Sequence, residues 1–281
     1  MLNQKILIVG ASGKVASEIT RILKTQNIEI RTTTSKKEKT TQDNVYLNLS
    51  TSEGIDKAFE GMDCAFIFSP AGFADQYRIL FPLIQESKKR KLKKVVLMSA
   101  MGADAVENSP LRRSEIELEK SGIQFNIIRP NWFMQNFNTF WIHGINTANK
   151  IFLPAGTART SFIDARDISD VAAKLLINDE FSNQSFDLTG PEALNHDEVA
   201  KHISEVSGRK ITYQEISPEE FKKSLLGAGL PEDYSDFLLM IMGALKEGYN
   251  ASIFDSVKKI LGRNPKTFKS YVEDFKQNWV V

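Results

Sequence analysis

Residues 5–16 constrain the fold of this chain more than any other stretch of the sequence. An apolar run at 6–9 has the length and branching of a strand that is buried on both faces. The run ends at Gly10, and after a few small residues the chain enters 16–23, where apolar residues recur at helical spacing. A strand, a tight glycine turn and a helix bring backbone N–H groups and a helix N-terminus to one point. The sequence therefore predicts a phosphate-binding turn.

The composition is that of a globular chain with no strong preference for polyanions. The 281 residues fit one large domain or one domain with a smaller lobe. Lys and Arg number 36 against 35 Asp and Glu, a balance that argues against nucleic-acid or membrane-surface binding through bulk charge. The first strand begins almost at Met1, and no apolar run approaches the ~20 residues of a membrane span. We expect a cytoplasmic protein without a signal peptide.

Cysteine and histidine usage gives no sign of a metal site or a disulfide. Cys64 is the single cysteine, and its apolar neighbours predict a buried core thiol. His143, His196 and His202 show no ligand spacing, so we expect no bound metal.

Strand-like and helix-like segments alternate through the first half of the chain. This alternation predicts an α/β fold, a Rossmann-type doubly wound parallel sheet that binds its ligand across the carboxyl ends of its strands. The expected strands are 5–9, 28–33, 45–47, 64–68, 94–99 and 125–129, with helices near 15–25, 52–60, 74–90 and 109–121.

The character of the chain changes after Thr189, where helical patterns dominate. Capping boxes that start at Asn195 and Ser217 predict two of these helices. We expect a dinucleotide-binding domain at 1–155, with 160–190 returning to its sheet. A smaller, mostly helical lobe at 190–281, with a contribution from 132–150, is expected to cover a substrate.

The glycine turn itself has the spacing Gly-x-x-Gly-x-x-Ala, from Gly10 through Gly13 to Ala16. Alanine at the last position is small enough for close packing of the helix on the strand. A P-loop is the competing interpretation, because Lys14 follows Gly13. It fails because Val15 stands where Ser or Thr should bind magnesium, and because the two glycines are too close together.

The end of the second strand indicates which dinucleotide is bound. An NAD site would place Asp or Glu there, to accept hydrogen bonds from the ribose 2′-hydroxyl. The only acidic residue, Glu29, lies early in the strand, whereas basic and hydroxyl side chains gather near its end. Such donors suit a 2′-phosphate and favour NADP(H) over NAD(H). The alternative is that these residues form an ordinary solvated turn. They are Arg31, Ser35, Lys36 and Lys37.

Small residues follow the fourth and fifth strands, where a dinucleotide would cross the sheet. Ser69 and Pro70 would let the backbone approach the cofactor, and Ser99 would reach its nicotinamide end. Further on, Phe133, Phe137 and Phe140 have helical spacing and are expected to share one face with Trp141. Core packing is one interpretation of this stripe, and a lining for the substrate site is the other.

Several longer motifs resemble the NmrA-like branch of the atypical short-chain dehydrogenases/reductases. They are the turn at 9–16, the segments 121–137 and 161–168, and the region 202–231, which is similar to triphenylmethane-dye and quinone reductases. The resemblance implies that Pro130, Trp132 and Phe133 lie around the nicotinamide ribose with Ser69, Pro70 and Ser99. It also implies a pyrophosphate site, formed by Gly10, Ser12, Gly13, Lys14 and Val15.

One departure from the family pattern concerns catalysis. Relatives with alcohol–ketone chemistry carry Tyr-x-x-x-Lys on the helix after the fifth strand, where the tyrosine protonates the carbonyl oxygen. Here Glu107 and Leu111 fall at those two positions, and neither can perform that role. No catalytic residue is therefore assigned.

The expected function is NADPH-dependent hydride transfer to a flat, electron-poor organic acceptor such as a quinone, dye or imine. The alternative is a catalytically silent NADP-sensing regulator that acts through a protein partner. A homodimer is a further expectation.

Overall fold

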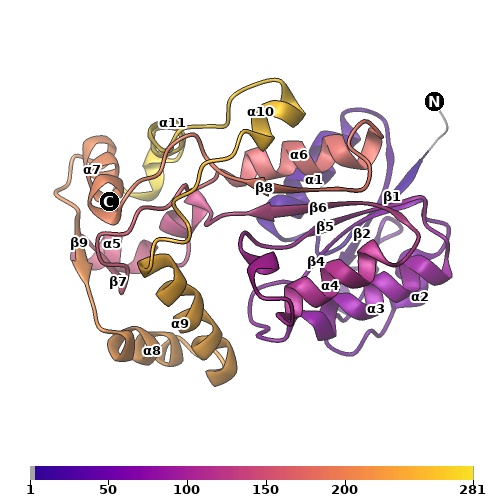
Figure 1. The fold of residues 1–281 in the computed structure, drawn as a ribbon, viewed down its shortest axis with the longest axis horizontal. Helices are drawn as coiled ribbons and strands as arrows, with labels where there is room; N and C mark the ends of the chain where they lie inside the picture. Colours follow the sequence, from indigo (N-terminus) through magenta and orange to yellow (C-terminus); the bar gives the residue numbers. More distant parts are fainter. Residues whose placement is uncertain (1–3, 281) are drawn as a thin grey trace. The chain divides into compact units, whose positions relative to one another are not determined.

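The computed structural model describes residues 4–280 and divides the chain into two compact units (Figure 1). The first unit is the chain up to Pro130 together with Ile168–Asp187, and the second is Asn131–Asp167 together with the chain from Leu188. At the start of the second unit, the side-chain amide of Asn131 donates to Ser161 Oγ (2.8 Å) and to the carbonyl oxygen of Asn250 (2.9 Å), both in the same unit.

The first unit is built on a seven-stranded sheet with the order β3-β2-β1-β4-β5-β6-β8. The pairs from β3 through β6 are parallel, as the sequence predicts. The order reverses direction between β1 and β4, and the carboxyl ends of these two strands flank the point where a doubly wound sheet binds ligands. The strands are β1 Lys5–Ile8, β2 Glu29–Thr34, β3 Asn44–Tyr46, β4 Cys64–Phe68, β5 Lys94–Met98, β6 Gln124–Pro130 and β8 Gln184–Leu188.

Helices cover both faces of this sheet (Figure 1). On one face lie α1 (Lys14–Lys24) and α6 (Ala165–Ile177), which are joined by a bond from Ser169 Oγ to the carbonyl oxygen of Val15. The other face carries α2 (Ile55–Phe59), α3 (Gln76–Lys89) and α4 (Pro110–Glu119) over a core of strand residues. Two short 3₁₀ turns, η1 (Lys37–Lys39) and η2 (Ala103–Ala105), follow β2 and β5.

The second unit is mostly helical and has its own apolar core. Strands β7 (Lys150–Leu153) and β9 (Thr212–Glu215) pair in parallel. Both predicted capping boxes are present, at Asn195 for α7 and at Ser217 for α8. The other elements are η3 Met134–Asn138, α5 Ile142–Ala148, α7 His196–Ser207, α8 Pro218–Gly227, α9 Glu232–Lys246, α10 Ser256–Leu261, α11 Phe268–Asp274 and η4 Lys276–Asn278.

The aromatic stripe at 133–141 does not form the single helical face that its spacing predicts. A 3₁₀ turn, η3, ends at Asn138, and Thr139 leaves helical geometry (φ −136°, ψ −84°) before α5 begins. Phe137 is fully buried, with its ring 5.2 Å from that of Phe162, whereas Phe140 is 70% exposed. Phe137 is therefore a core residue of the second unit. The break in the helix separates the two side chains.

Within residues 4–280, no helix combines the length and the apolar character that a membrane span requires.

Candidate functional site

Gly10 shapes the turn that follows β1. Its backbone has φ +71°, and its N–H donates to Thr33 Oγ1 on the neighbouring strand at 2.9 Å. A Cβ atom at Gly10 would lie 2.9 Å from the ring of Phe68, at the end of β4. Both the backbone conformation and the available room therefore demand glycine at this position.

The N-terminus of α1 is open toward the same turn. Its N-cap is Gly13, which has no side chain to cap the helix, and the first turn contains no acidic residue. Ser12 and Lys14 are exposed beside it, while Val15 and Ala16 are buried against the sheet. Unsatisfied N–H groups, a helix dipole and a lysine make a site for an anion such as a pyrophosphate.

The ends of β4 and β5 carry the two predicted serines. Ser69 follows β4, and its hydroxyl is buried without a hydrogen-bond partner within residues 4–280. Ser99 follows β5 and is held in line with β6, because its N–H donates to the carbonyl oxygen of Ile128 (2.8 Å). Pro70 directly follows Ser69. Ser69, Pro70 and Ser99 lie at the same carboxyl edge of the sheet as the glycine turn. The Ser69 hydroxyl, which has no partner among the described residues, could donate a hydrogen bond to a ribose oxygen or to the amide oxygen of a nicotinamide.

The end of β2 presents Ser35 and Lys36 to solvent. In the described part of the chain, no hydrogen bond or ion pair holds the Lys36 ammonium. Lys37 differs, because it pairs with Glu53 at 2.8 Å and lies over the ring of Tyr46. Ser35 and Lys36 are thus the side chains at this strand end that could hold a 2′-phosphate.

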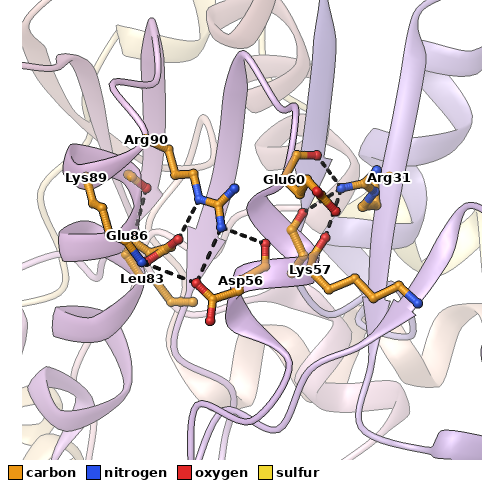
Figure 2. A network of polar contacts seen from close by, with 10 residues as sticks. Arg31, Asp56, Lys57, Glu60, Leu83, Glu86, Lys89 and Arg90 are labelled. Carbon is orange, nitrogen blue, oxygen red and sulfur yellow. Dashed lines mark hydrogen bonds and ion pairs between the residues drawn. The ribbon is translucent and has the colours of Figure 1, made fainter.

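Arg31 does not join them (Figure 2). It lies level with Leu7 in the sheet, three residues before the end of β2. Its guanidinium Nη1 donates to the carbonyl oxygens of Lys57 (2.9 Å), Ala58 (3.3 Å) and Glu60 (2.6 Å) at the C-terminal end of α2. The structure therefore gives Arg31 a different role from the predicted 2′-phosphate ligand: it satisfies carbonyl groups that the end of a helix leaves without partners.

The basic run at the end of α3 is also paired within the first unit (Figure 2). Arg90 Nε donates to Glu86 at 2.7 Å, and Lys89 contacts both Glu86 (3.1 Å) and Asp56 (3.2 Å). These acids offset the positive charges of Lys89 and Arg90.

Helix α4 uses its inner face for an ion pair. Leu111 packs against the apolar core, and Glu107 is exposed ahead of the helix. Glu115 is fully buried and accepts two hydrogen bonds from Arg129 of β6, at 2.9 Å and 2.8 Å. The third guanidinium nitrogen of Arg129 contacts Asp104 of η2 at 2.8 Å.

The electrostatics of this cluster follow from burial and pairing. Burial raises the pKa of Glu115, but hydrogen bonds from Arg129 and Arg112 help to lower it overall. Asp187, at the end of β8, has one carboxylate oxygen without a partner among the described residues, and burial raises its pKa despite the charge on Arg129. Sequence reasoning missed the cluster. The one signal in the sequence was Arg129, a charged residue at the end of an otherwise uncharged strand.

The remaining predicted site residues divide between the two units. Pro130 ends the first unit, whereas Trp132 and Phe133 belong to the second. There the ring of Trp132 lies 6.0 Å from that of Trp141, and the backbones of Phe133 and Ile163 form an isolated parallel β-bridge.

Comparisons with known proteins agree with this fold. The uncharacterized oxidoreductase YesF of Bacillus subtilis is 30% identical over 281 residues, with 99% of this chain and 98% of that protein covered. The NAD(P)H azoreductase of Xenophilus azovorans is 28% identical, with 95% and 96% covered. The crystal structure of the Citrobacter sp. triphenylmethane reductase complexed with NADP(H) superimposes with a TM-score of 0.81 at 20% identity, covering 95% of this chain and 98% of that one. A model of the NmrA-like family matches residues 2–272, and the chain belongs to that family.

Proposed function

We propose that the protein is an NADPH-dependent reductase of the atypical short-chain type. The observation that carries the proposal is the edge formed by the glycine turn, the open N-terminus of α1, and Ser35 with Lys36 at the end of β2. The turn is tight enough for a pyrophosphate to approach the backbone, and the strand end offers donors without a carboxylate acceptor. This combination suits NADPH better than NADH.

Two of the similar proteins support the proposal of an NADPH-dependent reductase. The azoreductase uses NAD(P)H by its name, and the triphenylmethane reductase was crystallised with NADP(H). The similarity to the azoreductase extends over nearly the full length of both chains. The edge residues would serve a silent NADP-sensing regulator equally well, and the reductase is favoured over it because the named relatives are an oxidoreductase and an azoreductase.

The acceptor is proposed to be an electron-poor organic compound such as a quinone, dye or imine. NADPH, when bound, supplies the hydride. At the positions that correspond to the proton-donating tyrosine and the lysine of short-chain dehydrogenases with alcohol–ketone chemistry, this chain has Glu107 ahead of α4 and Leu111 packed in the core. Acceptors that need little acid assistance fit this arrangement. The residues of the edge would hold the cofactor, orient it and limit access of water.

The experiment is a titration with NADPH and NADH, followed by an acceptor screen with the cofactor that binds more tightly. We expect tighter binding of NADPH and its oxidation by at least one quinone, azo or triphenylmethane dye, or imine. Binding of NADPH without oxidation across the whole panel would contradict the reductase and favour the sensor. Equal affinity for both cofactors would contradict the assignment of the β2 end.

A further inference from the structure

Arg129 connects three elements of the first unit through one guanidinium group. Two of its nitrogens bind Glu115 on α4, and the third binds Asp104 in η2, while Arg129 itself belongs to β6. The two acids differ in exposure: the Glu115 side chain is fully buried, and that of Asp104 is 45% exposed. The Glu115–Arg129 ion pair is thus part of the core, whereas the Asp104–Arg129 ion pair lies partly at the surface.

The Asp104–Arg129 ion pair contributes little to the free energy of unfolding, because ion pairs open to water are weak. It does, however, fix the middle of the segment 99–109, which connects β5 to α4. The start of this segment is held by backbone bonds from Ser99 to Ile128 (2.8 Å) and from Met101 to Pro130 (3.1 Å). Its end is held by Ser109 Oγ, which donates to the carbonyl oxygen of Ala103 (2.9 Å).

The segment 99–109 lies at the carboxyl edge of the sheet and begins with Ser99, which the proposed function places at the nicotinamide end of the cofactor. It also exposes an apolar side chain, Val106, which is 61% accessible. If the proposed function holds, a loop in this position would form a wall beside the reacting end of the cofactor. A displacement of about 1 Å at such a wall is enough to change a reaction rate severely.

We propose that the Asp104–Arg129 ion pair holds the segment 99–109 in the position required for hydride transfer, so that Asp104 is a positioning residue of the reductase. The proposal rests on the proposed function. Asp104 donates no proton and contacts no reacting atom. Its carboxylate acts through Arg129, whose orientation is set independently by the bidentate contact with Glu115.

The test compares Asp104→Asn and Asp104→Glu with a matched control, Asp63→Asn. Asp63 also forms a surface ion pair, with Lys93 at 2.7 Å, but it lies at the opposite, amino edge of the sheet. For each protein we would measure kcat, the dissociation constant of NADPH, the isotope effect with 4-deuterated NADPH, and amide exchange of residues 100–106.

We expect Asp104→Asn to lower kcat about tenfold and to raise the isotope effect, with a change of less than about threefold in the dissociation constant of NADPH. Amide exchange at 100–106 should become faster in this variant while the melting temperature stays nearly unchanged. Asp104→Glu should restore much of kcat, because it retains the carboxylate, and Asp63→Asn should behave as the unmodified protein.

Two results would overturn the positioning role. One is an unchanged kcat in Asp104→Asn, whatever the exchange shows. The other is a fall in kcat that the control shares. If the unmodified protein binds NADPH but oxidises none, the proposed function fails. In that case exchange with NADPH bound still tests the ion pair, and equal protection of 100–106 in both proteins would show that the pair does not hold the segment.

Discussion

Lys36 and Arg31 are both basic residues of the β2 region, but their side chains have different surroundings, and only Lys36 is proposed as a ligand of the 2′-phosphate. The Lys36 side chain is exposed just after the strand, whereas Arg31 is committed to the carbonyl oxygens at the end of α2. The difference comes from position along the strand. A residue three places before the strand end lies beside the helix that packs there, and a residue after the end faces the ligand edge.

Replacing Lys36 with alanine should weaken NADPH binding by about ten- to a hundredfold, because a charge-assisted hydrogen bond is lost. NADH binding should change little, since NADH has no 2′-phosphate. Titration calorimetry with both cofactors measures the effect. Lys39→Ala, at an exposed lysine of η1, is the control and should leave both affinities unchanged. Equal losses for NADPH and NADH would remove Lys36 from the 2′-phosphate site.

His196 is a second residue whose environment has a measurable consequence. It is fully buried in the second unit, and neither ring nitrogen has a partner among the described residues. The rings of Tyr213 and Phe162 lie 5.3 Å and 5.8 Å away. Burial in these surroundings lowers the pKa of His196 from 6.5 to about 4.

The free energy of unfolding should therefore fall as the pH decreases from about 7 to 4. The unfolded chain takes up the proton near pH 6.5, whereas the folded protein resists it until about pH 4. The loss attributable to His196 is at most about 3 kcal/mol. Urea denaturation at a series of pH values measures it. His196→Leu should flatten this part of the curve, and His143→Gln, at an exposed histidine, should keep it. Parallel curves for the unmodified protein and His196→Leu would contradict the assignment.

At the scale of elements, α2 depends on a side chain from the sheet. It is a helix of five residues with no side-chain N-cap, and isolated helices of this length are unstable. Arg31 of β2 supplies donors to its final carbonyl groups. A side chain more than 20 residues earlier in the chain therefore stabilises the C-terminal end of α2, and local helix propensity does not predict this contact.

Arg31→Met should lower the free energy of unfolding by about 1 kcal/mol, because three carbonyl groups at the end of α2, two of them open to solvent, lose a charged donor. The ratio of NADPH to NADH affinity should stay the same. Chemical denaturation and cofactor titration measure the two effects. The control is Arg21→Met, which removes an exposed ion pair with Glu18 that contributes little to stability. A selective loss of NADPH affinity in Arg31→Met would contradict this role and show that Arg31 contacts the 2′-phosphate.

At the scale of the whole molecule, the chain leaves the sheet after β6 and returns to it at α6 and β8 before it ends in the second unit. Sequence patterns identify the strands of the sheet and the helices that cover it, but not the break between η3 and α5. The side chain of Asn131 bonds to residues about 30 and 120 positions later, all within the second unit. Contacts of that separation leave no trace in a local pattern.

What the sequence determined by itself is local: the parallel strands, the glycine turn, the helix that follows it and the capping boxes. Each depends on neighbouring residues, whose spacing sets backbone conformation and hydrogen bonding directly. The tertiary structure decided the partners of Arg31 and Arg129, the burial of Phe137 and His196, and the exposure of Phe140. Those outcomes depend on which distant element packs against a residue. The glycine turn was therefore predictable from the sequence, whereas the ion pair proposed to position the loop beside it was not.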